Sequence, residues 1–173
     1  AGGASAAATA RVPVEKAIPL TKATSRPDAK FHMVTIITRQ SKFDELKVED
    51  KVTDSLTGTK HYHFWGASAN TVEFTLEQQV DNLKSGKYNY AISIMGGDGG
   101  ETTIYAYVKI NGEIAYKEMT EISVYNEWHT AKISNIEYSE GDAITIGIYV
   151  KCAGPNAWGK IDDALLNSVG EQR

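Results

Sequence analysis

The sequence predicts an all-β sandwich, of jelly-roll type rather than immunoglobulin type. The chain contains about eight or nine short runs rich in β-branched and aromatic residues, separated by turn residues, and no convincing amphipathic helix interrupts them. The Cys–Trp–Cys spacing of true immunoglobulin domains is absent, because Cys152 is the only cysteine.

The size and composition suit one globular domain. Of the 173 residues, 42% are hydrophobic and 23% are charged. Residues 1–10 are nearly all small, and residues 11–30 contain three of the four prolines. We therefore expect residues 1–30 to be a linker, a cloning remnant or an irregular N-terminal segment with short edge strands at most. Residues 31–173 are expected to form the sandwich.

The strands are expected wherever apolar and polar residues alternate or β-branched and aromatic residues gather. The runs are residues 33–40, 61–67, 71–80, 87–95, 102–110, 113–119, 127–138, 143–152 and 158–166. In the fourth run, Tyr88, Tyr90, Ile92 and Ile94 should share one face.

Turns between these runs complete the pattern. Asn111-Gly112, between two alternating runs, is the clearest hairpin signal. The glycine cluster at residues 96–100 has no helix after it, so it predicts a loop between two strands rather than a phosphate site. Residues 44–56 are the one helical candidate, and a weak one.

Charge and hydropathy disfavour several classes of partner. The formal net charge is −4, and basic residues are scattered, which disfavours nucleic acid and anionic membranes. No stretch approaches the length of apolar residues that a membrane-spanning helix needs. A single cysteine excludes internal disulfides, and Cys152 is expected to fill the core.

Motifs of common enzymes are missing. The chain has no Gly-x-Ser-x-Gly, no His-Glu-x-x-His and no P-loop. His61 and His63 share a face of one strand, but no third metal ligand is evident, so surface or packing roles are expected. Acidic residues are numerous enough that a glycosidase pair stays open.

Three tryptophans are candidates for stacking on a sugar ring. If Tyr62 and Phe64 pack in the core, Trp65 on the same strand should face outward. Trp158 lies between a turn and a glycine, and Trp128 begins an alternating strand. Each can equally be a core residue. An exposed indole binds the apolar face of a pyranose ring.

The paired acids Asp162 and Asp163 raise a separate question. Strict alternation places Ile161, Asp163 and Leu165 on one face, and Asp162 and Ala164 on the other, so one carboxylate should face the apolar interior. Burying an unpaired carboxylate is unfavourable, and a hard cation such as Ca²⁺ would remove that penalty. The alternative is that the strand starts later and both acids are solvated.

Four segments together resemble the family-61 carbohydrate-binding modules appended to bacterial family-53 endo-β-1,4-galactanases. The segments are YHFW (residues 62–65), FTLEQQV (74–80), SGKYNYAISIMGGDGG (85–100) and ITIGIYVKCAGPNAWGKIDDALL (144–166). The similarity runs in order over about residues 55–168. The resemblance implies a secreted, non-catalytic jelly roll that binds β-1,4-galactan, the side chain of pectin, and targets an appended glycoside hydrolase. It also implies a structural calcium, for which Asp163 is the expected ligand, with others from the first strand and from the loop near Thr57.

A sugar site built from these elements would combine aromatic stacking with polar contacts. Trp65 or Trp158 is expected to form the platform, with Trp128 in reserve. The polar candidates are Asp98, Glu101, Asn156 and Arg39. We expect a monomer. Two other functions remain open: a small glycanase or lyase on a jelly roll, and a structural or adhesive sandwich without a sugar site.

Overall fold

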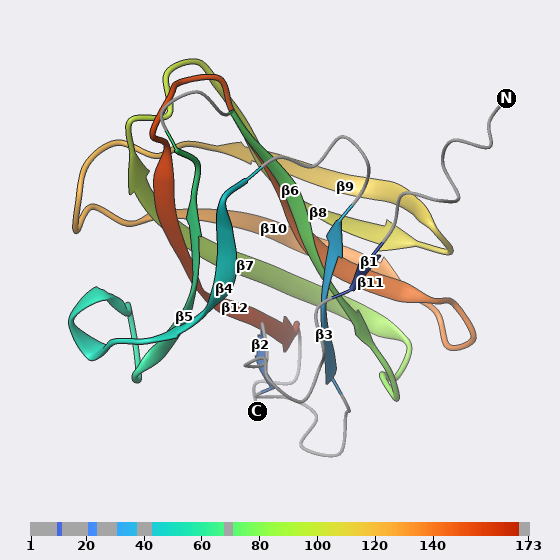
Figure 1. Ribbon diagram of the computed structural model, residues 1–173. Helices are drawn as coiled ribbons and strands as arrows, with labels where there is room; N and C mark the ends of the chain where they lie inside the picture. Colours follow the sequence, from blue (N-terminus) through green and yellow to red (C-terminus); the bar gives the residue numbers. More distant parts are fainter. Residues whose placement is uncertain (1–9, 12–20, 24–30, 38–42, 68–70, 170–173) are drawn as a thin grey trace, which may run out of the picture.

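The computed structural model describes residues 10–11, 21–23, 31–37, 43–67 and 71–169, and shows a sandwich of two β-sheets (Figure 1). Twelve strands are described: β1 (Ala10–Arg11), β2 (Thr21–Ala23), β3 (Phe31–Ile37), β4 (Glu45–Asp50), β5 (Lys60–Trp65), β6 (Val72–Val80), β7 (Gly86–Gly97), β8 (Thr102–Ile110), β9 (Glu113–Thr120), β10 (His129–Tyr138), β11 (Ile144–Cys152) and β12 (Trp158–Ser168).

The two sheets are built from strands that are distant in sequence. The first sheet has the order β1-β3-β6-β11-β8-β9, and the second has the order β10-β7-β12-β5-β4, with β2 added beside β12. Neighbours are antiparallel throughout the described strands except for the parallel pair of β2 with β12. The last strand, β12, thus lies in the middle of the second sheet, between β7 and β5. The predicted all-β sandwich of jelly-roll type is confirmed.

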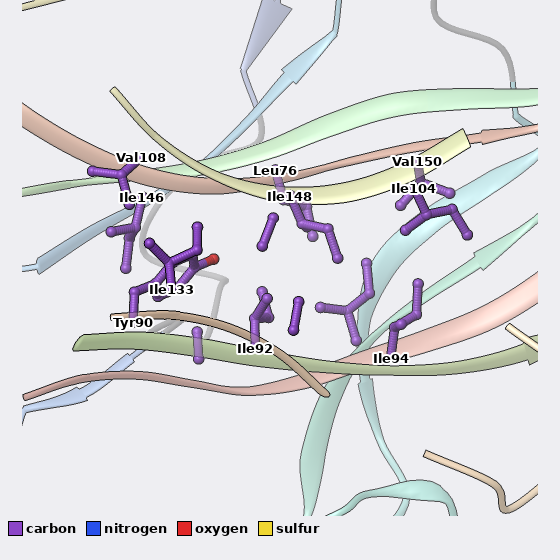
Figure 2. Close-up of a cluster of buried hydrophobic side chains, with 14 of the residues drawn as sticks. Leu76, Tyr90, Ile92, Ile94, Ile104, Val108, Ile133, Ile146, Ile148 and Val150 are labelled. Carbon is purple, nitrogen blue, oxygen red and sulfur yellow. The ribbon is translucent and has the colours of Figure 1, made fainter. Parts of the chain in front are cut away.

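One hydrophobic core fills the space between the sheets (Figure 2). The first sheet contributes Leu76, Ile104, Val108, Ile146, Ile148 and Val150, and the second contributes Tyr90, Ile92, Ile94 and Ile133. The Tyr90 hydroxyl crosses the core and donates to the Gly147 carbonyl at 3.0 Å, so this buried polar group has a hydrogen-bond partner. Cys152 is buried in the same core, as expected.

Several local predictions are confirmed. Val72, Phe74, Leu76 and Val80 of β6 are buried, as is Gln78 on the same face, while the alternate residues are partly or fully exposed. Asn111 and Gly112 join β8 to β9, and both have positive φ, as a type I′ turn requires. The glycine cluster ends β7 and leads into β8 as a loop.

The helical reading of residues 44–56 is wrong. Glu45–Asp50 form β4, and only Val52–Asp54 form a short 3-10 helix. Leu46 and Val48 pack against the core while Glu45, Lys47 and Glu49 share the other face. This period of two is a strand pattern, and pairing with β5 stabilises it over the local helix propensity.

Strict alternation through Asp162 and Asp163 is also wrong. The pairing of β12 with β7 shifts by one residue between Asp162 and Leu165, and Asp163 has a φ of 53°. This β-bulge inserts one residue, so Ile161, Ala164 and Leu166 face the core. Neither acid points into the apolar interior.

Candidate functional site

Two tryptophans lie side by side on the outer face of the second sheet. Trp65 of β5 and Trp158 of β12 are direct cross-strand partners. Gly97 of β7 and Glu45 of β4 extend the same row on either side. Directly opposed residues on antiparallel strands project from the same face, so both indoles belong to one surface. Trp65 is 36% exposed, and its neighbour Phe64 is buried, as predicted from their alternation.

The indole of Trp158 lies over the position where Gly97 has no side chain. A Cβ atom at Gly97 would lie 3.0 Å from Nε1 and 3.1 Å from two ring carbons of Trp158. Trp158 Nε1 donates to the Asp98 carboxylate at 3.2 Å. The ring is therefore laid along β7 and held at its polar end, which leaves it oriented as a platform.

Tyr125 stands beside this platform. Its ring centroid lies 6.4 Å from that of Trp158, with 40° between the planes. The Tyr125 hydroxyl donates to Asp54 Oδ1 at 2.8 Å, and the backbone N–H of Asn126 donates to Met95 Sδ. These contacts hold residues 121–128, between β9 and β10, against the second sheet.

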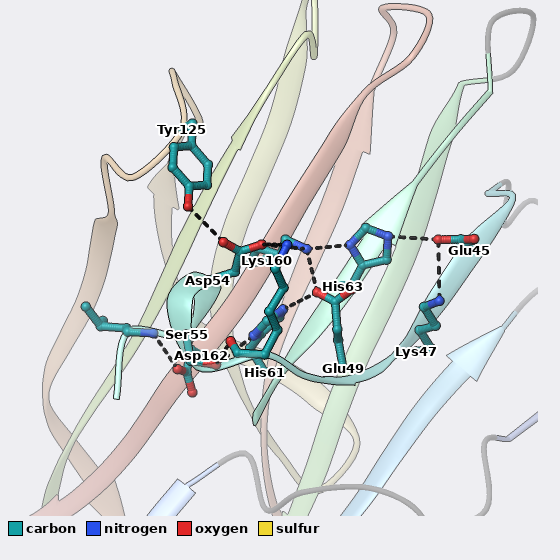
Figure 3. A network of polar contacts seen from close by, with 12 residues as sticks. Glu45, Lys47, Glu49, Asp54, Ser55, His61, His63, Tyr125, Lys160 and Asp162 are labelled. Carbon is teal, nitrogen blue, oxygen red and sulfur yellow. Dashed lines mark hydrogen bonds and ion pairs between the residues drawn. The ribbon is translucent and has the colours of Figure 1, made fainter. Parts of the chain in front are cut away.

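A charged network occupies the next row of the same sheet (Figure 3). Lys160 of β12 is the cross-strand partner of His63 on one side and Met95 on the other. Lys160 is only 6% exposed. It donates to Glu49 Oε1 at 2.6 Å and to His63 Nδ1 at 2.9 Å, and it lies 3.7 Å from Asp54 Oδ2. The buried charge is therefore compensated from three directions.

The network fixes the protonation of its members. Because an ammonium group only donates, His63 must accept at Nδ1, and its Nε2–H then donates to Glu45 at 2.9 Å. Burial and the charge of Lys160 lower the pKa of His63. Burial would raise the pKa of Glu49, but hydrogen bonds from Lys160 and His61 outweigh it and lower that pKa to about 2. At neutral pH the site therefore presents a neutral imidazole, a carboxylate and an ammonium.

His61 has a different environment from His63. Its ring is fully buried, and it bonds Glu49 Oε1 at 2.7 Å and Ser55 Oγ at 2.8 Å. The two histidines share a face of β5 as predicted, but each has its own carboxylate partner. Both rings are thus explained by packing and hydrogen bonding within the sheet.

The loops that carry the polar candidates converge near Trp158. Gly154 N–H donates to the Gly99 carbonyl at 2.7 Å, and Ala153 N–H donates to the Glu101 carbonyl at 2.9 Å. The loop with Asp98 and Glu101 therefore runs beside the loop with Asn156. Asp98 touches Trp158, while Glu101 and Asn156 have exposed side chains.

The remaining predicted site residues are placed less centrally. Trp128 is partly buried just before β10 and is not a strand partner of Trp65 or Trp158. Arg39 lies outside the described residues. Sequence reasoning did not select Lys160, Glu49 or Tyr125. The alternation of Glu45, Lys47 and Glu49 was a signal for an outward-facing charged strand, but it was read as a weak helix.

Asp162 is satisfied by backbone amides. Its carboxylate accepts from the N–H groups of Leu56 at 2.9 Å, Thr57 at 3.2 Å and Asp163 at 2.8 Å. Burial raises the pKa of Asp162, and the amide of Thr57 opposes that shift. These three amide N–H groups offset the cost of burying the Asp162 carboxylate, which a cation would otherwise have to offset. They also attach the loop at residues 55–58 to β12.

Asp163 faces the same loop. Its Oδ1 accepts from the Thr57 hydroxyl, so Asp163 contacts the loop that was expected to supply further calcium ligands. Within residues 43–67 and 71–169, whose side chains are described, no three His, Cys, Asp or Glu residues group as a metal site. These residues thus offer a calcium ion one accessible carboxylate, and further oxygen ligands would have to come from elsewhere.

No helix among the described residues is long and apolar enough to cross a membrane. No protein-family model matches the chain, and no curated protein matches its sequence.

Solved structures similar to this chain include a carbohydrate-binding module and a domain of a phage tailspike protein. One is TmCBM61 in complex with β-1,4-galactotriose, at 23% identity and a TM-score of 0.63, covering 83% of this chain and 90% of that one. The other is the enzymatically active domain of tailspike protein 4 of bacteriophage CBA120, at 8% identity and a TM-score of 0.53, covering 88% of this chain but 22% of that one. Both likenesses show the fold, a β-sandwich that is also found in a carbohydrate-binding module.

Proposed function

We propose that this protein is a non-catalytic carbohydrate-binding module that recognises β-1,4-galactan. The observation that carries the proposal is the cross-strand pair of Trp65 and Trp158 on one outer face, with Trp158 laid over Gly97. Two adjacent indoles can stack on the apolar faces of neighbouring sugar units. The likeness to TmCBM61, whose structure holds β-1,4-galactotriose, favours this ligand among neutral glycans.

Polar groups beside the tryptophans would read the sugar hydroxyls. Glu45 and Glu49 are partly exposed acceptors beside the platform, and His63 and Lys160 hold them in a fixed direction. Charge-assisted hydrogen bonds depend strongly on direction, so such a set can distinguish an axial from an equatorial hydroxyl. Asp98 is in contact with Trp158 and extends the set at the loop. Glu101, Asn156, Arg39 and Trp128 stay predicted contributors.

The charges argue for binding rather than bond cleavage. A glycosidase needs one carboxyl group that can donate a proton to the leaving oxygen. Glu49 has a pKa of about 2 and is held by Lys160, so near the tryptophans it is an acceptor at neutral pH. We infer that the module acts outside the cell as a monomer and brings an appended glycoside hydrolase to pectin side chains. Affinity of micromolar to millimolar order is expected, because few contacts offset the ordering of the ligand.

A structural calcium ion at Asp163 belongs to the same proposal. The bulge turns Asp163 away from the core and toward the Thr57 loop, where its carboxylate contacts the Thr57 hydroxyl. A bound ion would attach β12 to that loop and stabilise the sandwich without taking part in sugar recognition.

Calorimetry with β-1,4-galactotriose tests the proposal, with cellotriose and xylotriose as specificity controls. We expect heat with galactotriose, and a loss of at least tenfold in affinity for Trp65→Ala and Trp158→Ala. Glu140→Ala, at an exposed position in the turn between β10 and β11, is the control and should bind as the native chain does. Heat with none of the three sugars would refute the binding function. New reducing ends from galactan would instead establish an enzyme.

A further inference from the structure

A second aromatic surface lies on the outer face of the first sheet, on the opposite side of the sandwich. Tyr149 of β11 is the direct cross-strand partner of Tyr105 of β8, and their ring centroids lie 5.1 Å apart. Tyr107 stands two residues along β8, with its centroid 6.0 Å from that of Tyr105. Three phenol rings therefore cluster on two neighbouring strands.

Tyr107 is placed by a glycine in the same way as Trp158. Gly147 of β11 is its cross-strand partner, and a Cβ atom there would lie 2.6 Å from the Tyr107 ring. The missing side chain lets Tyr107 reach across β11 and donate to Glu77 Oε1 on β6 at 2.7 Å. The Tyr107 ring therefore crosses β11, which lies between β8 and β6, and forms a rigid floor for the tyrosine cluster.

The cluster is held by charges that balance. Lys109 Nζ lies 2.7 Å from Glu77 Oε1, and the Tyr149 hydroxyl donates to Glu73. Lys117 Nζ lies 4.4 Å from the Tyr105 ring centroid, a cation–π contact. Two carboxylates and two ammonium groups thus surround the rings. Their charges balance, so the surface favours neither an anion nor a cation.

The rings and the Glu77–Lys109 pair enclose a hollow of about 200 Å³. Thr75 and Ile114 complete its lining. A carboxylate accepts at two oxygens and an ammonium donates three hydrogen bonds, so Glu77 and Lys109 retain capacity beyond their mutual contact. The volume is below the roughly 300–1,000 Å³ of sites for drug-sized ligands, which suits one sugar unit or a chain end.

We propose that this tyrosine hollow is a second binding site for a neutral sugar, separate from the tryptophan surface. Pre-oriented aromatic rings, a hydroxyl and a balanced charged pair match a ligand that is apolar on its ring faces and hydroxylated at its edges. Two sites on opposite faces let one molecule contact two glycan chains, or two segments of one chain, with a gain in avidity. The proposal stands on its own contacts and does not require galactan as the ligand.

An NMR titration of the full ¹⁵N-labelled chain tests this proposal, with β-1,4-galactotriose, cellotriose and xylotriose each added to millimolar concentration. We expect at least one of these sugars to shift the amide signals of Tyr105, Tyr107 and Tyr149. The shifts should persist in Trp158→Ala, which removes the first platform, and should be lost in Tyr149→Ala. If Tyr149→Ala does not fold, Lys109→Met serves instead, with the same expected loss.

The same spectra separate the two proposals. Shifts confined to residues around Trp65 and Trp158 in all three titrations would overturn the tyrosine site and leave the proposed function intact. Shifts at the tyrosines alone would support the tyrosine site and contradict sugar binding at the tryptophan surface. Tyrosine shifts that disappear in Trp158→Ala while the fold is retained would also overturn the second site, because they would report an indirect effect of the first.

Discussion

Lys160 Nζ donates to His63 Nδ1 across the β12–β5 pair, at 2.9 Å, and this contact requires His63 to be neutral. A protonated ring would carry an N–H toward the ammonium group and could no longer accept its hydrogen bond. The remaining charges around the ring are Glu45 at Nε2 and Glu49 beyond Lys160. The tryptophan surface therefore lies next to an imidazole whose pKa burial and the Lys160 charge hold below its ordinary value.

Acidification should weaken the fold through His63. Burial and Lys160 lower the pKa of His63 below its ordinary value of 6.5, so the unfolded chain takes up this proton first. The contribution of neutral His63 to stability is complete above pH 6.5 and is lost as the pH falls through the folded pKa. Melting temperatures measured from pH 8 to pH 5 should fall less in His63→Gln than in the native chain. Equal pH profiles would contradict this role.

Glu49→Gln should be strongly destabilising. The substitution leaves the buried Lys160 with Asp54 as its remaining carboxylate partner. Because breaking a buried ion pair costs about 3 kcal/mol, we expect a loss of that order in the free energy of unfolding determined with urea. For Glu49 the folded state favours the charged form, whereas for His63 it favours the neutral form. The pKa of Glu49 is lowered from 4.5 to about 2, so its contribution to stability is present above pH 4.5 and is lost toward pH 2. Adding Lys160→Met to Glu49→Gln should restore part of the stability.

Gly97→Ala should reduce binding more than stability. The new Cβ would lie 3.0 Å from Trp158 Nε1 and force the indole off the strand. We expect about a tenfold loss of galactotriose affinity, equivalent to roughly 1.4 kcal/mol. Gly159→Ala is the contrasting variant, because its Cβ would lie 2.3 Å from the buried Phe64 ring and should lower the melting temperature instead. Unchanged affinity in Gly97→Ala would show that the indole orientation is not used.

Tyr125→Phe should loosen the segment beside Trp158. The variant removes the hydroxyl that donates to Asp54 at 2.8 Å while it keeps the ring. Burial would raise the pKa of Asp54, but the hydrogen bonds from Tyr125 and Lys51 lower it, so the variant should bring this pKa upward. Only a small loss of overall stability is expected, because Tyr125 is exposed. Hydrogen exchange should become faster at residues 121–128, with β6 as an internal reference that stays unchanged.

Asp163→Asn tests the calcium prediction without disturbing the backbone. Asp163 has a φ of 53°, and asparagine tolerates this left-handed conformation while it removes the charge. If calcium binds at Asp163, a chelator should lower the melting temperature of the native chain and have much less effect on the variant. A native chain that melts at the same temperature with calcium and with chelator would argue against the site.

Much of the fold was predictable because it rests on local periodicity. The alternation in β6, the buried face of β7 and the turn at Asn111-Gly112 depend on side chains a few residues apart, and all three are as predicted. The strand β4 was not recognised, because its pattern is compatible with a short helix until β5 pairs with it.

The site was predictable only in part. The outward direction of Trp65 follows from its buried neighbour Phe64, which is information within one strand. That Trp158 is its partner depends on the placement of β12 between β5 and β7, a pairing of residues 93 positions apart in the chain that no local pattern encodes.

By itself, then, the sequence determined the class of fold, the faces of most strands and the presence of aromatic and acidic residues suited to a sugar site. The tertiary structure alone decided which of them meet. The bulge at Asp163 reversed the expected faces of β12, and sheet register brought Lys160 to His63 and Glu49. The physical reason is that alternation is a property of one strand, whereas register and bulges are set by hydrogen bonds and packing between strands.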